Sequence, residues 1–271
     1  ELLRRSTPVS KLISRHTRDL LRAYYKAGRI STPIADRQVD DRFVEMSPDE
    51  WRVYRQVEDY ISNVYDRAES DKRNAVGFVM TVYRRRVASS FRALANTLHA
   101  RRNPLNYTVD LRFPVSEDAS DDESLDEIMD ADDVLRLERE SARAEERAEI
   151  ERLLEEVRRL PVDTKANELK TILRELREAG YRQVMVFSQY TDTMDFLREE
   201  LRREGYTGIL CFSGRGGEVL GSDGKWQTVS RADIKRRFRG GNAEILLCTD
   251  AAAEGLNFQF CGALVNYDLP W

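Results

Sequence analysis

The chain has 271 residues, which suits one large domain or two ordinary ones. Its 34% of charged and 41% of hydrophobic residues fit a protein with long, solvated helices. No apolar run approaches the roughly eighteen residues of a membrane span, and the N-terminus has neither a signal-peptide core nor a starting Met. We therefore expect no membrane partner and a piece of a longer protein.

Charge is distributed unevenly along the chain. Residues 1–105 carry 21 basic and 13 acidic groups, a net charge of +8, whereas residues 106–159 carry 8 and 19, a net charge of −11. A basic first third is compatible with a polyanionic partner. Charge alone is equally compatible with solvated helix faces.

The first 160 residues predict mainly helices. Residues 7–28 are expected to form a helix and residues 42–46 a short strand. A strong helix start follows, because Ser47 can cap, Pro48 suits the first helical position and Glu50 completes a capping box.

The helix after Ser47 places four apolar side chains on one face: Tyr54, Val57, Ile61 and Val64. A second, antiparallel helix is expected over about 74–102, and a further helix over about 134–160. Between them, residues 116–133 are acidic and rich in Ser, which predicts a flexible loop.

After Pro161 the pattern changes to helices that alternate with short apolar strands. Strands are expected at 184–187, 209–212, 244–248 and 263–267, with a mobile glycine-rich loop at 214–224. Unbroken apolar strands between helices are typical of a parallel sheet covered on both faces. Residues 161–271 are therefore expected to form a three-layer α/β domain.

The cysteines Cys211, Cys248 and Cys261 each lie in an apolar run. We expect buried, reduced thiols in a cytoplasmic protein. His16 and His99 are far apart, and no Cys or His pair has metal-ligand spacing, so we expect no metal site.

Ligands of open α/β sheets bind at the carboxyl ends of the strands, and three such ends are polar here. At the first, residues 187–191, N–H groups and hydroxyls before a helix suit a phosphate. Taken alone, a plain helix cap at Ser188 or Thr191 explains them better. The third end, residues 249–257, leads into small residues that allow close backbone approach, but its composition also fits an ordinary turn.

The second strand end, at Ser213 and Gly214, opens the glycine-rich loop. A Walker A loop would need Gly at position 219 and Ser or Thr at position 226, where the chain has Val219 and Trp226. A P-loop is therefore excluded.

Together these segments resemble, in order and spacing, the second RecA-like lobe of superfamily-two helicases. Residues 184–190 resemble motif IV, residues 249–257 resemble motif V, and residues 265–270 are similar to the strand that leads to motif VI. Arg231 matches a basic residue of the motif between IV and V. Thr228 departs from the pattern, because many helicases have Gln there.

The first 160 residues narrow the resemblance to the Swi/Snf ATPases. Residues 13–18 resemble the arginine-rich segment that leaves the first lobe, and residues 46–48 with Tyr54 resemble the next strand–helix element. Residues 254–260 are especially similar to the bacterial RNA-polymerase-associated branch. The implied domains are a brace or linker segment, a helical protrusion, and a second RecA-like lobe truncated before motif VI: residues 1–46, 47–160 and 161–271.

The resemblance implies an ATP-dependent nucleic-acid translocase, with duplex DNA as the expected substrate and RNA polymerase as a candidate protein partner. ATP and Mg²⁺ would lie between this lobe and a first lobe in cis. The chain has neither the Walker A lysine and acidic box of that lobe nor the arginines of motif VI. We therefore expect this fragment to be inactive alone and to bind no cofactor by itself.

By the same resemblance, three residues would face the nucleotide: Glu254, Gly255 and Asn257. Six residues would form or support a surface that binds the nucleic-acid backbone: Ser188, Gln189, Ser213, Gly214, Arg231 and Thr249. Contacts to the phosphate backbone position the protein on the nucleic acid without recognising its bases. Little base specificity and a strong salt dependence of binding are therefore expected.

Two other functions are weighed against this one. A non-catalytic interaction module, with a flavodoxin-like domain and a helical arm, explains the missing Walker A lysine but not the ordered motifs. A nucleotide-binding regulatory domain that uses the glycine-rich loop fails at Val219 and Trp226. The arginines at 84–86 could touch nucleic acid, although a solvated face is the favoured explanation.

Overall fold

The computed structural model describes six stretches of the chain: residues 17–31, 38–66, 73–103, 144–161, 163–249 and 260–268. The chain divides into two compact units, Glu1–Phe43 and Val44–Trp271. In the first unit, helix α3 (Arg18–Lys26) lies within the predicted 7–28 helix, whose first ten residues are outside the described ones. None of the described helices is long and apolar enough to cross a membrane.

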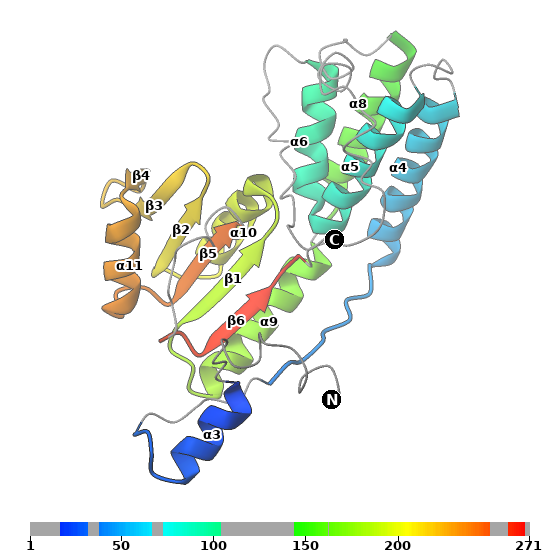
Figure 1. Ribbon diagram of the computed structural model, residues 1–271. Helices are drawn as coiled ribbons and strands as arrows, with labels where there is room; N and C mark the ends of the chain where they lie inside the picture. The colour runs from blue at the N-terminus through cyan, green and yellow to red at the C-terminus, as the bar shows by residue number, and fades with distance from the viewer. Residues whose placement is uncertain are drawn as a thin grey trace, which may run out of the picture. The chain divides into compact units, whose positions relative to one another are not determined.

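The N-terminal part of the second unit is a group of four helices (Figure 1). They are α4 (Pro48–Asp66), α5 (Arg73–Ser89), α6 (Phe91–Arg102) and α8 (Ala144–Arg159). Their shared core contains Val57, Ile61, Leu94, Leu98 and Ile150, all at most 1% exposed. The predicted acidic loop at 116–133 and the start of the predicted 134–160 helix lie outside the described residues.

The start of α4 confirms the predicted capping box. The Ser47 N–H donates to the Glu50 carboxylate at 2.7 Å, and the Glu50 N–H donates to the Ser47 hydroxyl oxygen at 3.3 Å. The same carboxylate accepts the N–H of Thr164 at 2.7 Å. Burial would raise the pKa of Glu50, but the hydrogen bonds from Thr164 and Ser47 outweigh it and lower that pKa below its ordinary value.

The predicted strand at 42–46 is wrong. These residues have no regular structure, and no strand pairs with them in the described part of the chain. The Phe43 side chain is 94% exposed. A β-branched or aromatic run forms a strand only where a neighbour supplies ladder hydrogen bonds and a packed face.

The single helix predicted over 74–102 is two helices, α5 and α6. Ser90 separates them in an extended conformation, with φ −162° and ψ 149°, and its hydroxyl oxygen accepts the N–H of Ala93 at 3.0 Å. Apolar spacing continues across the break, so periodicity cannot reveal it. Ser90 acts as the cap that starts a new helix.

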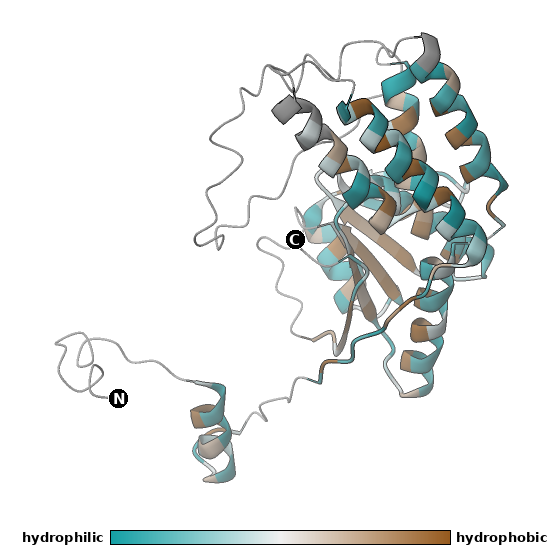
Figure 2. Ribbon diagram, turned by 90° about the vertical axis from the view of Figure 1, so that its right-hand side faces the viewer, coloured by the Kyte–Doolittle hydropathy of each residue, from teal (hydrophilic) through white to brown (hydrophobic). Residues whose placement is uncertain are grey.

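The C-terminal part is an α/β layer structure around a six-stranded sheet of order β4-β3-β2-β5-β1-β6. Its strands are β1 (Val184–Ser188), β2 (Ile209–Ser213), β3 (Gly216–Leu220), β4 (Trp226–Val229), β5 (Ile245–Thr249) and β6 (Ala263–Asn266). β2, β5, β1 and β6 are parallel neighbours. Figure 2 shows the strands in brown. β2, β5 and β1 are buried on both faces, whereas β6 at the edge of the sheet is partly exposed.

Helices cover both faces of this sheet. α9 (Thr164–Glu178) and α10 (Thr191–Arg203) share one core with the strands, and α11 (Arg231–Arg239) shares a second core with the other face. Asp163 caps the start of α9, because its carboxylate accepts the N–H of Ala166 at 2.8 Å. This arrangement confirms the predicted three-layer α/β class with a mainly helical N-terminal part.

The predicted mobile loop at 214–224 is instead a β-hairpin, so the sheet is mixed and not purely parallel. β3 pairs antiparallel with β2, and β4 pairs antiparallel with β3. Gly224 turns the hairpin with φ +74°. A Cβ on Gly217 would lie 2.4 Å from the Ile234 side chain, so this glycine lets α11 pack closely on β3.

The three thiols are free. Cys211 and Cys248 are at most 1% exposed on the neighbouring strands β2 and β5, whereas Cys261 is only partly buried. Burial raises the pKa of Cys211 to about 12 and raises that of Cys248 as well. In the described ranges, no group of three His, Cys, Asp or Glu side chains could hold a metal ion.

Candidate nucleic-acid interface

Three parallel strands end at one edge of the sheet. Ser188 of β1 pairs with Thr249 of β5, and β2 ends in Ser213 on the other side of β5. Ligands of open α/β sheets bind beyond such carboxyl ends. We call this edge the rim and define it by five residues: Ser188, Gln189, Ser213, Gly214 and Thr249.

The hydroxyl groups of the rim point into the protein. Ser188, Ser213 and Thr249 are each at most 4% exposed. The Ser188 hydroxyl donates to Asp268 at 2.7 Å, and the Ser213 hydroxyl oxygen accepts the N–H of Arg215 at 3.2 Å. These two hydroxyls hold the turns at the rim, and their contact with a phosphate stays a prediction.

Gln189 follows Ser188 in the turn that leads from β1 to α10. Its backbone N–H donates to Asp268 at 2.9 Å. Its side-chain oxygen is buried and makes no hydrogen bond to any described part of the protein. A polar atom in this state at the rim is available to a ligand donor or to water.

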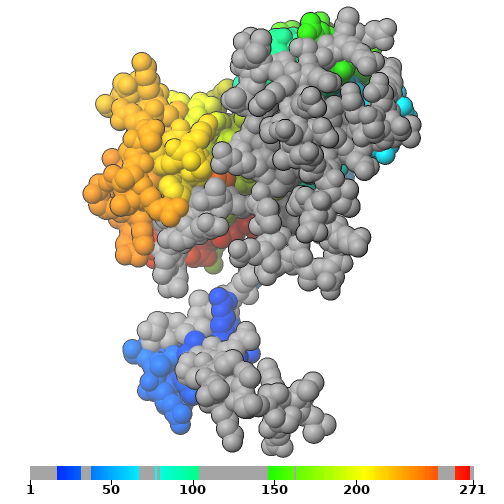
Figure 3. Space-filling model, turned by 45° about the horizontal axis from the view of Figure 1, so that its top comes forward, coloured from blue at the N-terminus to red at the C-terminus, as the bar shows by residue number. Residues whose placement is uncertain are grey.

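Two of the predicted residues are exposed, Gly214 and Arg231. β4 runs antiparallel to β3 and ends on the rim side of the sheet, so α11 begins there with Arg231. The Arg231 guanidinium lies over the Phe212 ring, 5.2 Å from its centroid. Figure 3 shows part of the hairpin and α11, in yellow and orange, at the surface.

The residues predicted to face a nucleotide, Glu254, Gly255 and Asn257, lie outside the described residues. The rim therefore consists of the ends of β1, β2 and β5, with the cation of Arg231 beside them. The structure therefore brings together the predicted residues that it describes: 188–189, 213–214, Thr249 and Arg231.

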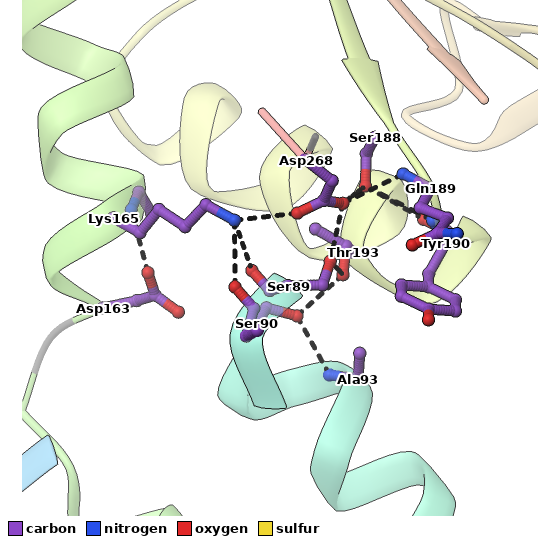
Figure 4. Close-up of polar contacts among 12 residues, drawn as sticks. Ser89, Ser90, Ala93, Asp163, Lys165, Ser188, Gln189, Tyr190, Thr193 and Asp268 are labelled. Atoms are coloured by element: carbon purple, nitrogen blue, oxygen red, sulfur yellow. Dashed lines mark hydrogen bonds and ion pairs between the residues drawn. The ribbon is translucent and has the colours of Figure 1, made fainter. Parts of the chain in front are cut away.

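Asp268 joins the rim to the helical part, and it was not among the predicted site residues. Its carboxylate accepts the hydroxyls of Ser188 and Ser89, each at 2.7 Å, and the N–H of Gln189 (Figure 4). The Lys165 ammonium donates to the other carboxylate oxygen at 2.8 Å. The Asp268 side chain is only 6% exposed, so this carboxylate is a buried, fully used acceptor.

Lys165 supplies the countercharge for Asp268. Its ammonium also donates to the carbonyl oxygens of Ala88 and Ser89, at 3.0 and 3.4 Å, where α5 ends. Its nitrogen lies 4.2 Å from the centroid of the Tyr267 ring. A cation at the last carbonyls of a helix is favourable, so Lys165 also stabilises the end of α5.

Arg86 makes a second link between the helical part and α10. Its guanidinium is buried, with 2% of the side chain exposed, and donates to the Asp192 carboxylate at 2.6 Å. It lies 4.8 Å from the centroid of the Tyr190 ring. Both explanations considered for Arg86, a solvated face and a nucleic-acid contact, are therefore wrong.

The neighbouring Arg84 behaves differently. Its side chain is 47% exposed and pairs with Glu58 at 3.1 Å. It fits the favoured explanation of a solvated helix face.

The segment that contains the sheet is similar to a known family of domains. Residues 164–271 match the family model described as the helicase conserved C-terminal domain. This segment contains the sheet, the rim and Asp268.

Curated relatives are similar to part of this chain. An "uncharacterized ATP-dependent helicase" of Bacillus subtilis, YqhH, is 29% identical over 44% of this chain and 18% of its own length. The "ATP-dependent RNA helicase fal1" of Schizosaccharomyces pombe is 31% identical over 32% of this chain and 20% of its own length. The chain spans about a fifth of the length of these relatives.

Among solved structures, the "SWI2/SNF2 ATPase C-terminal domain" of Sulfolobus solfataricus is similar to 86% of this chain, over 72% of its own length, with 15% identity and a TM-score of 0.46. The "Hef helicase domain" of Pyrococcus furiosus is similar to 85% of this chain, over 50% of its own length, with 14% identity and a TM-score of 0.47.

Proposed function

We propose that this chain is the second motor lobe, with its helical lead-in, of an ATP-dependent translocase of the Swi/Snf type acting on duplex DNA in the cytoplasm. The observation that carries the proposal is the rim, where the ends of β1, β2 and β5 meet beside the exposed Arg231. An edge of this kind binds ligands in open α/β sheets, and a cation beside it suits a phosphate backbone.

In this proposal the exposed groups of the rim touch the nucleic acid. Gly214 leaves its backbone open to a phosphate, and Arg231 supplies the charge. Ser188, Ser213 and Thr249 support these contacts from within, because they are buried. Glu254, Gly255 and Asn257 would face ATP and Mg²⁺ across a cleft to a first lobe, and RNA polymerase is a candidate protein partner.

The chain alone is expected to bind a duplex of random sequence weakly, with a dissociation constant of about 10⁻⁴ to 10⁻⁶ M at physiological salt. Arg231→Ala should reduce the slope of log K against log salt concentration by about 0.9, because one phosphate contact is lost. Fluorescence anisotropy over a salt series, with duplex DNA, duplex RNA and a second DNA sequence, measures this.

Arg236→Ala is the matched control for Arg231→Ala. Arg236 lies in the same helix, is 75% exposed and pairs with Asp233, so its removal should leave the salt slope unchanged. Equal effects of the two changes would argue against a contact at Arg231. Absence of binding to any duplex would favour a protein-interaction module, the alternative function.

In the complete gene product, Asn257→Ala should lower the nucleic-acid-stimulated ATPase rate by about 100-fold, as loss of one positioned polar contact at a reacting phosphate does. Asn242→Ala is the control, since Asn242 is exposed in the turn after α11, away from the rim. A stimulated ATPase assay measures both. An unchanged rate in Asn257→Ala would remove this residue from the nucleotide site.

A further inference from the structure

A continuous chain of hydrogen bonds runs from the start of α6 to the turn after β1 (Figure 4). The Ala93 N–H donates to the Ser90 hydroxyl oxygen, and the hydroxyl oxygens of Ser90 and Ser89 each lie 2.8 Å from that of Thr193. Ser89 then donates to Asp268 at 2.7 Å. On the far side, Asp268 accepts the hydroxyl of Ser188 and the N–H of Gln189.

Only one assignment of donors and acceptors satisfies this series of hydrogen bonds. A hydroxyl group has a single proton, and an ionised carboxylate only accepts. Because Ser89 donates to Asp268, Thr193 must donate to Ser89, and Ser90 must then donate to Thr193. Hydrogen bonds aligned in one direction strengthen one another, so breaking one weakens the whole chain.

This series of hydrogen bonds ends at the rim. Asp268 holds Ser188 and Gln189 from behind, and the Tyr190 N–H lies 3.4 Å from the Ser188 hydroxyl oxygen. The Gln189 side chain, with its unpartnered oxygen, is carried by the same turn. The position of this turn therefore depends on where α5 ends and α6 begins.

We propose that Ser89 is a positioning residue: through Asp268 it sets the turn at Ser188 and Gln189 for nucleic-acid binding and couples the helical part to the rim. This inference rests on the proposed function of the rim. Ser89 is 3% exposed, and among the described residues its hydroxyl makes hydrogen bonds to Thr193 and Asp268 alone. It therefore acts on a ligand through these neighbours and not by contact.

The test compares nucleic-acid affinities of folded variants of the 271-residue chain on one duplex DNA. Ser89→Ala and Thr193→Val break the same contact from opposite sides, and each is expected to raise the dissociation constant about fivefold. The dissociation constant of the double variant should be no higher than those of the single variants, because both changes act on one series of hydrogen bonds. The salt slope should stay at the wild-type value, since no phosphate contact is lost.

Thr97→Val is the matched control. It also removes a buried hydroxyl from the helical part, but that hydroxyl donates to the Ala93 carbonyl within α6 and, in the described ranges, to no group of the rim or of Asp268. Its dissociation constant should stay within about twofold of the wild-type value. Affinities are compared at a temperature where circular dichroism shows every variant to be folded, so general loss of stability does not enter.

Three outcomes are distinct. Fivefold weaker binding in both variants at an unchanged salt slope supports Ser89 as a positioning residue. Wild-type affinity in Ser89→Ala and Thr193→Val overturns it and leaves the proposed function standing, whereas a wild-type chain that binds no duplex overturns both. If Ser89→Ala does not fold, Thr193→Val decides alone.

Discussion

Asp268→Ala is expected to lower the free energy of unfolding by about 3–5 kcal/mol, the usual cost of removing one partner of a buried ion pair. The change leaves the Lys165 ammonium without its carboxylate, and it leaves the Ser89 and Ser188 hydroxyls and the Gln189 N–H without an acceptor. Urea unfolding of the chain, followed by circular dichroism, measures the loss.

Two further variants make this result specific. Glu58→Ala also removes a carboxylate from an ion pair, but in the pair with Arg84 the two side chains are 30% and 47% exposed, so the pair should contribute less than about 1 kcal/mol. Lys165→Met combined with Asp268→Ala should cost less than the sum of the two single changes, because no charge is then left unpaired. A loss below about 1 kcal/mol for Asp268→Ala would mean that the carboxylate is dispensable.

Arg86→Met should lower the free energy of unfolding by about 2–4 kcal/mol. The buried guanidinium bonds Asp192 and lies over Tyr190, and the methionine keeps much of the apolar volume but none of the donors. The expected loss is smaller than for Asp268, because the Asp192 side chain is 26% exposed and water can solvate it.

The matched control for Arg86 lies two residues away on the same helix. Arg84→Met removes the same charge from a side chain that is 47% exposed, and it should cost less than about 1 kcal/mol. Equal losses for the two variants in urea unfolding would contradict the burial of Arg86.

The sequence predicted the elements whose signal is local. Unbroken apolar runs identified β1, β2, β5 and β6 to within a residue or two, and the capping box at Ser47 and Glu50 is confirmed. The hairpin was missed because its glycines are typical of loops. These residues form a strand because they pair with β2 and pack under Ile234, and the neighbouring sequence shows neither contact.

The junction at Asp268 was missed for a similar reason. Its partners Gln189, Lys165 and Ser89 are 79, 103 and 179 residues away in the sequence. Burial of Arg86 could not be predicted from the sequence either, since a run of three arginines predicts solvent-exposed side chains. A polar residue directly after a predicted apolar strand, as Asp268 is after 263–267, was the one local signal that pointed to this junction.

The free thiols can report local opening of the helices that cover the sheet. Cys261 should react first with a thiol reagent, because it is only partly buried, whereas Cys211 and Cys248 lie on neighbouring strands in the middle of the sheet. Cys211 packs in the core with α9 and α10, and Cys248 packs in the core with α11 on the other face. Labelling of each thiol therefore requires the helices on its face to open, so its rate reports the free energy of that local opening. Labelling with and without nucleic acid would thus show whether a ligand at the rim stabilises the helices that cover the two faces of the sheet.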